Sequence, residues 1–147
     1  MVNDAKGEWS GILTIEAVKD LISKVPEAEL PGDNRSILAA VLQREAQMAT
    51  YLGKGRAIPH CRLESLDKPT LIFGRAGDGI PLENSNERAE LIFLLLTPGG
   101  MARIQPRLLA DIVGLVESEY VTERLKTAAE PGEVIETIRD GQQVVLD

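Results

Sequence analysis

His60 is the single histidine of the chain and the residue whose type most readily suggests chemistry. A neutral imidazole nitrogen is a nucleophile near neutral pH. His60 follows a glycine-punctuated extended segment, residues 53–58, and Pro59 restricts the backbone just before it. Arg62 supplies a nearby cation that could hold an anion. These local features are compatible with a functional histidine, and also with a loop or buried structural histidine.

Other kinds of site are poorly supported by the residue types present. Zinc needs three or four His, Cys or carboxylate ligands, and only the neighbours His60 and Cys61 are available. Adjacent residues in an extended chain point to opposite sides, so a Cys–His nucleophilic pair is disfavoured and Cys61 is interpreted as a packing residue. The glycines at 53–55 and 77–79 lack the Lys-Ser/Thr of a phosphate loop and are interpreted as turn residues. We expect no metal and no cofactor.

The composition is typical of one small domain with an aliphatic core. The chain has 147 residues, of which 44% are hydrophobic and 3% aromatic. Its net charge is −7 and its 16 basic residues are scattered, which disfavours nucleic-acid binding, because such binding needs a basic stripe. One cysteine allows no intramolecular disulfide, which suits a reducing compartment.

No segment is predicted to enter a membrane. Residues 1–9 are polar and lack the apolar region of a secretory signal. The longest apolar run, residues 91–96, is far too short to cross a bilayer. We therefore expect a cytoplasmic protein without direct membrane insertion.

Two helices are predicted in the first third of the chain. Apolar residues at helical spacing predict them over residues 14–25 and 34–47, each capped by its first residue. The second helix would carry Arg44 and Glu45 on its last turns. Its predicted apolar face comprises Ile37, Leu38, Val41 and Leu42.

Extended segments are predicted in the middle of the chain. Short pieces at 50–52 and 56–58 precede His60, which we expect in a loop after a strand end. Residues 70–74 predict a strand. Residues 89–96 are almost continuously apolar, which is typical of a central strand covered on both faces.

The last third is predicted to be helical. Pro106 suits the first turn of a helix, and an apolar stripe at helical spacing follows it. Two further helices are predicted over 121–129 and 131–139, the last one stopped at Gly141. The alternation of helices and buried strands predicts a single α/β domain with a mixed sheet flanked by helices. We place it at 13–141, after a polar N-terminal segment, 1–12, and before a C-terminal tail, 142–147.

A longer motif around His60 resembles a known family. Arg44-Glu45 is followed, after a short gap, by Thr50 and by Gly-Lys-Gly-Arg-Ala-Ile-Pro-His, residues 53–60. This string closely resembles the signature of fructose/mannitol-type enzyme IIA domains, including the nitrogen-regulatory branch. Those domains are phosphocarrier components of bacterial sugar phosphotransferase systems. Weaker similarity continues to about Gly141.

The resemblance implies roles for individual residues. His60 would take a phosphoryl group from the phosphohistidine of HPr or a related carrier protein. Arg44 matches the family's arginine beside the active histidine, and Thr50 matches a threonine that shapes the site. A guanidinium fork suits phosphate oxygens, so Arg44 is the first candidate stabiliser and Arg62 the second. The alternatives are a helix C-terminal cation for Arg44 and a solvated loop charge for Arg62.

The chain departs from the family at a second position. Family members commonly carry another histidine at the start of the helix after the central strand, facing the first histidine. Gln105, just before Pro106, occupies that position here. A glutamine amide donates a hydrogen bond but cannot become cationic. We predict that Gln105 faces His60 and donates to the phosphoryl oxygens near a helix N-terminus.

The sequence is compatible with two functions. The first is a phosphotransferase-system component, rather than a stand-alone turnover enzyme, that accepts a phosphoryl group on His60 and passes it on or signals with it. The second is a regulatory or interaction module with little or no phosphotransfer, such as the cytoplasmic domain of a membrane transporter or antiporter. Arg44 and His60 favour the first function, and Gln105 favours the second. The sequence indicates neither a sugar, a permease nor an oligomeric state.

Overall fold

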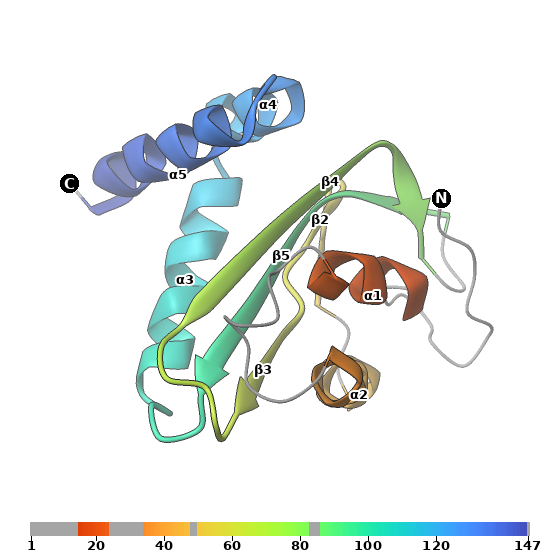
Figure 1. Ribbon diagram of the computed structural model, residues 1–147. Coiled ribbons are helices and arrows are strands. Elements are labelled where there is room, and N and C mark those ends of the chain that lie inside the picture. The colour runs from red at the N-terminus through yellow and green to blue at the C-terminus, as the bar shows by residue number, and fades with distance from the viewer. Residues whose placement is uncertain (1–14, 24–33, 48–49, 83–85, 147) are drawn as a thin grey trace. The chain divides into compact units, whose positions relative to one another are not determined.

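The computed structural model describes residues 15–23, 34–47, 50–82 and 86–146 of the chain. The chain divides into two compact units, Met1–Ala102 and Arg103–Asp147. The first unit contains the strands and two helices, and the second contains three helices (Figure 1). The expected N-terminal segment, 1–12, lies outside the described residues.

The two helices of the first unit are α1, Ile15–Ser23, and α2, Asn34–Gln47. The predicted apolar face of α2 packs into the core, with Ile37 and Val41 fully buried and Leu38 and Leu42 partly so. The capping prediction for Asn34 is wrong, because Asn34 is the first helical residue and its Oδ1 makes no hydrogen bond among the described residues. The predicted cap Thr14 lies outside those residues.

The sheet is mixed and is built around β5, Arg88–Pro98. Antiparallel β4, Thr70–Pro81, lies along one side of β5, as Figure 1 shows. Parallel strands β2, Arg56–Ala57, and β3, His60–Leu63, follow each other along its other side. β1, Tyr51–Gly53, pairs with β2 at the outer edge. The prediction of a central strand is therefore confirmed.

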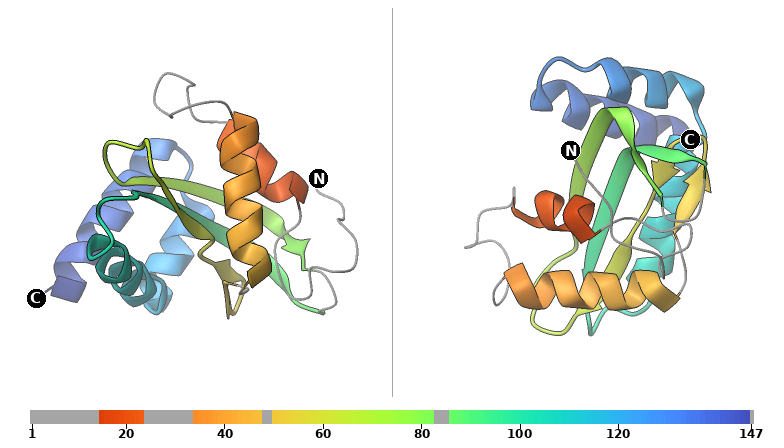
Figure 2. Two further views of the ribbon diagram at one scale, coloured as in Figure 1. Left: turned by 90° about the horizontal axis from the view of Figure 1, so that it is seen from below. Right: turned by 90° about the vertical axis from the view of Figure 1, so that its right-hand side faces the viewer.

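The core of the first unit lies between the sheet and its two helices. Figure 2 shows α1 and α2 on one face of the sheet, and α1 contacts β4 while α2 contacts β3. Alternate residues of β5, Ile92, Leu94 and Leu96, point into this cluster together with Val18 and Val41. The C-terminal end of α2 is thereby held against the strand that begins with His60.

The prediction that the glycines at 77 and 79 are turn residues is wrong. Both lie within β4, which continues far beyond the predicted end at Gly74. The pairing of β4 with β5 shifts register between Arg75 and Ile80, and Gly79 adopts a φ of 78° there. A bulge needs an extra residue and often a left-handed backbone, and glycine accommodates both.

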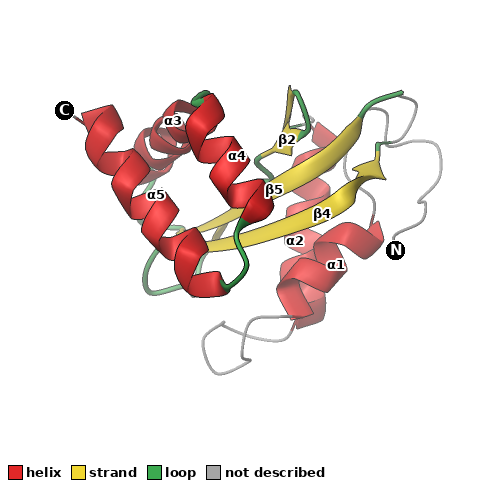
Figure 3. Cartoon of the chain, turned by 90° about the horizontal axis from the view of Figure 1, so that it is seen from above, coloured by secondary structure: helices red, strands yellow, loops and turns green. Residues whose placement is uncertain are grey.

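The second unit contains α3, Ile104–Val116, α4, Glu119–Thr127, and α5, Pro131–Leu146 (Figure 3). Pro106 lies in the first turn of α3, as predicted. The helix end predicted at Gly141 is wrong, because α5 continues to Leu146, and residues 142–146 of the expected tail are helical. A glycine inside a helix costs only about 1 kcal/mol, which the rest of a long helix readily offsets.

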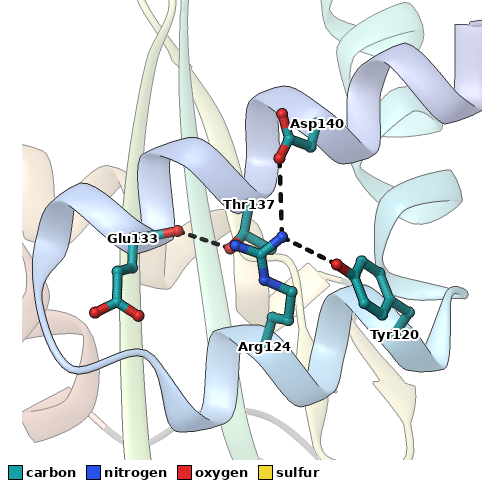
Figure 4. Close-up of polar contacts among 5 residues, drawn as sticks. All are labelled: Tyr120, Arg124, Glu133, Thr137 and Asp140. Carbon is teal, nitrogen blue, oxygen red and sulfur yellow. Dashed lines mark hydrogen bonds and ion pairs between the residues drawn. The ribbon is translucent and has the colours of Figure 1, made fainter.

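An ion pair joins α4 and α5, and further hydrogen bonds lie within each of these helices. Arg124 donates to the Tyr120 hydroxyl at 3.2 Å and lies 3.8 Å from the Asp140 carboxylate (Figure 4). The buried hydroxyl of Thr137 donates to the backbone carbonyl of Glu133 at 2.7 Å. Among the described residues, no helix is both long enough and apolar enough to cross a membrane.

Candidate functional site

His60 begins strand β3 rather than lying in a loop, which corrects the sequence prediction. Pro59 has no N–H group and therefore interrupts the hydrogen-bonded ladder between β2 and β3. Its carbonyl still accepts a hydrogen bond from Leu95 N–H at 2.9 Å, and His60 pairs with Leu95 immediately afterwards. The side chain of His60 is thus carried on a strand beside the central β5, and it remains partly exposed.

Within the described residues, each ring nitrogen of His60 lies beside one hydrogen-bonding group. Nδ1 lies 2.9 Å from the carbonyl oxygen of Ile58, and Nε2 lies 3.3 Å from Nη2 of Arg44. A carbonyl only accepts, so Nδ1 carries the proton and donates to Ile58. A guanidinium only donates, so Nε2 presents its lone pair. The two contacts together select one neutral tautomer, with Nε2 as the nucleophilic nitrogen.

The electrostatic setting of His60 favours this neutral form. Burial lowers the pKa of His60 below its ordinary value of 6.5, and the positive charge of Arg44 lowers the pKa further. The hydrogen bond to Ile58 acts in the opposite direction and raises the pKa. The net effect is a pKa below the ordinary value, so the imidazole is available as a nucleophile at neutral pH.

Arg44 is positioned by the last turn of α2. Because this end of the helix packs against β3, the guanidinium of Arg44 lies beside the His60 ring although the two residues are 16 positions apart. A guanidinium offers several N–H donors in a planar fork, which matches phosphate oxygens. The pair thus combines a nucleophilic nitrogen with an anion-binding group.

Thr50 makes two hydrogen bonds to the carboxylate of Glu45. Its hydroxyl donates to Oε1 of Glu45 at 2.8 Å, and its N–H donates to Oε2 at 3.3 Å. Glu45 is 1% exposed, and the motif around His60 predicted no role for it although it contains this residue. The signal was present in the spacing, because Glu45 continues the buried stripe of Ile37 and Val41 at intervals of four residues.

Two further residues, Arg62 and Gln105, were predicted to belong to the site. Arg62 is exposed on β3, and alternation along the strand places it on the same face as His60. Gln105 is the second residue of α3, in the second unit. Its expected position opposite His60 stays a prediction.

Cys61 lies on the opposite face of β3 and packs into the core at 5% exposure. Burial raises the pKa of the Cys61 thiol to about 11, so the thiol stays protonated and is a poor nucleophile at neutral pH. Among the described residues, no group of three or more His, Cys, Asp or Glu side chains could hold a metal ion.

Several solved structures share this fold. Nitrogen regulatory protein IIA-Ntr from Neisseria meningitidis has a TM-score of 0.77 at 21% identity, with 88% of each chain covered. Enzyme IIA mannitol from Escherichia coli has a TM-score of 0.69 at 21% identity, covering 92% of this chain and 99% of that one. Enzyme IIA mannitol has also been solved in complex with phosphorylated enzyme IIB, with a TM-score of 0.70 at 19% identity, covering 93% of this chain and 98% of that chain. The fold is the α/β fold of the enzyme IIA class.

Sequence relatives narrow the class to a family. A nitrogen regulatory protein of Bradyrhizobium diazoefficiens is 34% identical over 77% of this chain and 74% of its own length. The fructose-specific EIIA component of Haloferax volcanii is 29% identical over 76% and 73%. The match to the fructose-specific EIIABC component of Bacillus subtilis, at 27% identity, covers 82% of this chain but 19% of that longer protein.

The family model for the phosphoenolpyruvate-dependent sugar phosphotransferase system, EIIA 2, matches residues 14–141. The chain belongs to this EIIA 2 family.

Proposed function

We propose that this chain is a phosphocarrier that accepts a phosphoryl group on Nε2 of His60 from the phosphohistidine of an HPr-like carrier protein. The observation that carries the proposal is the pairing of His60 and Arg44, in which Nδ1 is held by Ile58 and Nε2 lies 3.3 Å from the guanidinium. Membership of the EIIA 2 family supports it.

The transfer follows from the tautomer. The lone pair of His60 Nε2 attacks the phosphorus, a new N–P bond forms, and the N–P bond to the donor histidine breaks. The electron pair of the broken bond returns to the donor imidazole. Phosphoryl transfer depends mainly on positioning and on charge stabilisation. Arg44 exchanges its contact with Nε2 for contacts with the phosphoryl oxygens.

The same geometry supports onward transfer. While the phosphoryl group is on Nε2, the Ile58 carbonyl favours a proton on Nδ1, and a protonated imidazole is a good leaving group. The phosphoryl group therefore remains transferable to a second protein. A phosphorylated enzyme IIB forms a complex with enzyme IIA mannitol, and a protein of that kind is our candidate receiver. We assign the chain to the cytoplasm, because a single cysteine allows no intramolecular disulfide and suits a reducing compartment.

The test is phosphorylation by carriers from the chain's own organism. Wild-type protein incubated with a phosphorylated HPr-like carrier should gain one phosphoryl group, labile in acid and stable in base. His60→Ala should gain none, and the assignment is unambiguous because the chain has one histidine. If no carrier of that organism labels the wild type, the phosphocarrier proposal fails.

A second function is favoured by a specific residue. Gln105 stands where the resemblance implies another histidine, which suits a regulatory or interaction module that relays no phosphoryl group. Several relatives carry the name nitrogen regulatory protein, and one relative is a much longer fructose-specific EIIABC component. This alternative predicts an unlabelled wild type whose partner binding is unaffected by His60→Ala.

A further inference from the structure

Glu45 is a buried carboxylate that the proposed transfer does not use. It lies in the last turn of α2, next to Arg44, and is 1% exposed. Removing a carboxylate from water is costly unless donors compensate for the lost hydration. Thr50 supplies two donors, its hydroxyl to Oε1 and its N–H to Oε2. The carboxylate therefore ties Thr50 to the end of the helix.

A chain of hydrogen bonds leads from this carboxylate to the His60 ring. The carbonyl of Thr50 accepts from the N–H of Ile58 at 3.1 Å. The carbonyl of Ile58 in turn accepts from Nδ1 of His60 at 2.9 Å. The position of the Ile58 carbonyl, which selects the tautomer, thus depends on where Glu45 holds Thr50.

One turn of α2 consequently controls both nitrogens of the ring. Arg44 reaches Nε2 directly, and Glu45 acts on Nδ1 through Thr50 and Ile58. We infer that Glu45 is a positioning residue that keeps His60 in the Nδ1–H tautomer and aligned with Arg44. The inference rests on the proposed function, because the Nδ1–H tautomer matters only if His60 accepts a phosphoryl group. The tautomer itself can be measured without any phosphoryl donor.

Loss of the Glu45 contact has a defined chemical consequence. If the Ile58 carbonyl shifts, the proton of the neutral ring redistributes to Nε2. In that tautomer Nε2 has no lone pair for attack and cannot accept a hydrogen bond from Arg44. The nucleophile is then lost in proportion to the population of the wrong tautomer.

The experiment uses the full chain labelled with ¹⁵N-histidine, in which the one imidazole gives an unambiguous spectrum. Glu45→Gln keeps the shape of the side chain and removes its charge. Thr50→Val removes the hydroxyl donor at nearly constant volume, and Thr50→Ser restores it. Thr137→Val is the matched control, because Thr137 is also a buried threonine whose hydroxyl donates a hydrogen bond, here to Glu133 in the second unit (Figure 4).

The wild type and Thr50→Ser should show the Nδ1–H tautomer. Glu45→Gln and Thr50→Val should shift the imidazole toward the Nε2–H form and slow phosphoryl transfer by about tenfold, the lower end of the range known for loss of a partner that orients a metal-bound histidine. Thr137→Val should lower the melting temperature without changing the tautomer.

The inference is overturned if Thr50→Val or a folded Glu45→Gln variant loses stability yet keeps the wild-type tautomer, because Glu45 would then serve the fold alone. Should Glu45→Gln not fold, Thr50→Val decides the question. A wild type with the Nδ1–H tautomer that no carrier phosphorylates would sink the proposed function and leave the positioning role standing.

Discussion

The imidazole of His60 differs from an exposed histidine in that each nitrogen is assigned to one partner. Ile58 holds the proton on Nδ1, and Arg44 faces the lone pair on Nε2. Burial and the adjacent positive charge both lower the pKa of His60, and the two effects protect the nucleophilic form. The reactivity of this residue therefore comes from its surroundings and is open to test by small changes in them.

The first expectation at this scale concerns pH. Because the pKa of His60 lies below the ordinary 6.5, the phosphorylation rate should stay constant as the pH falls through 6.5 and decline only at lower pH. Between pH 6.5 and the lower pKa of the folded chain, His60 binds a proton in the unfolded chain but not in the folded chain. The contribution of His60 to the free energy of unfolding is therefore lost as the pH falls through this range. An NMR titration of the one histidine, with urea unfolding of wild type and His60→Gln, measures both effects. A measured pKa of His60 at or above 6.5 would contradict the conclusion that burial and Arg44 favour the neutral imidazole.

The second expectation concerns Arg44. Arg44→Gln should slow phosphorylation by about a hundredfold, the typical loss for one preorganised donor at a developing anion. The phosphorylation rate of Arg44→Lys should lie between the rates of the wild type and of Arg44→Gln, because lysine keeps the positive charge but lacks the planar fork of N–H donors. The pKa of His60 should rise in Arg44→Gln, since a neighbouring positive charge is removed. Quench-flow transfer kinetics and the NMR titration provide the measurements.

Arg62→Gln serves as the control for that series. Arg62 is exposed on the strand that carries His60, so its replacement should have a smaller effect than Arg44→Gln. A larger effect at Arg62, or a wild-type rate in Arg44→Gln, would mean that Arg44 acts only as a cation at the C-terminus of α2.

At the scale of elements, the site depends on two short strands that share one side of β5. Strand β2 and strand β3 together form an interrupted parallel strand, with Pro59 at the interruption. The carbonyls of Gly55 and Pro59 keep this segment in register by accepting hydrogen bonds from Leu91 and Leu95, each at 2.9 Å. The start of β3, and with it His60, is thus fixed by a neighbouring strand.

Gly55 gives a test of this register. Its φ of 81° is left-handed, and a Cβ at this position would lie 2.8 Å from Oε1 of Glu90. Gly55→Ala should therefore lower the free energy of unfolding by about 1 to 3 kcal/mol. Gly77→Ala, in the bulge of β4, is the matched control, because a Cβ there meets nothing within 4 Å and its φ is not left-handed.

Urea unfolding distinguishes the two glycines. Gly77→Ala should change stability by less than about 1 kcal/mol. Equal losses in the two variants would show that the backbone of the β1–β2 hairpin, which contains Gly55, does not require a glycine there. Gly55→Ala protein that remains folded should also show a weaker Nδ1 hydrogen bond in the His60 spectrum, because the hairpin leads directly into Ile58.

At the scale of the whole molecule, the hydrogen-bond partners found for His60 all lie in the first unit, while Gln105 belongs to the second. Gln105 occupies the first turn of α3, where backbone N–H groups lack intrahelical partners and favour an anion. We expect that Gln105→His speeds phosphoryl transfer and that Gln105→Ala slows it, by less than the hundredfold loss expected at Arg44, since a neutral donor contributes less than a charged one.

Transfer kinetics with circular dichroism as a folding control would measure the effect of Gln105. A rate that neither substitution changes would show that the position is only structural. An active Gln105→His variant beside an inactive wild type would instead support the regulatory function for the natural chain.

Local patterns in the sequence determined much of the fold. Helix α2, the apolar strand β5 and the place of Pro106 in α3 were predicted, because helical periodicity, unbroken apolar runs and proline geometry act over a few residues. The Arg44 and His60 pair was reached through a resemblance rather than through spacing, since a helix and a strand meet there only in the folded chain.

Tertiary structure alone decided the remaining features. The length of β4 and the strand conformation of His60 depend on pairing with β5, which is distant in the sequence. The bond between Glu45 and Thr50 joins two residues that are close in the sequence but belong to different elements of the fold. Backbone hydrogen bonds with β5 let β4 continue beyond Gly74 and let a strand resume after Pro59. A buried carboxylate is tolerated only where donors converge on it, and that convergence exists only once the helix end and the hairpin have packed together.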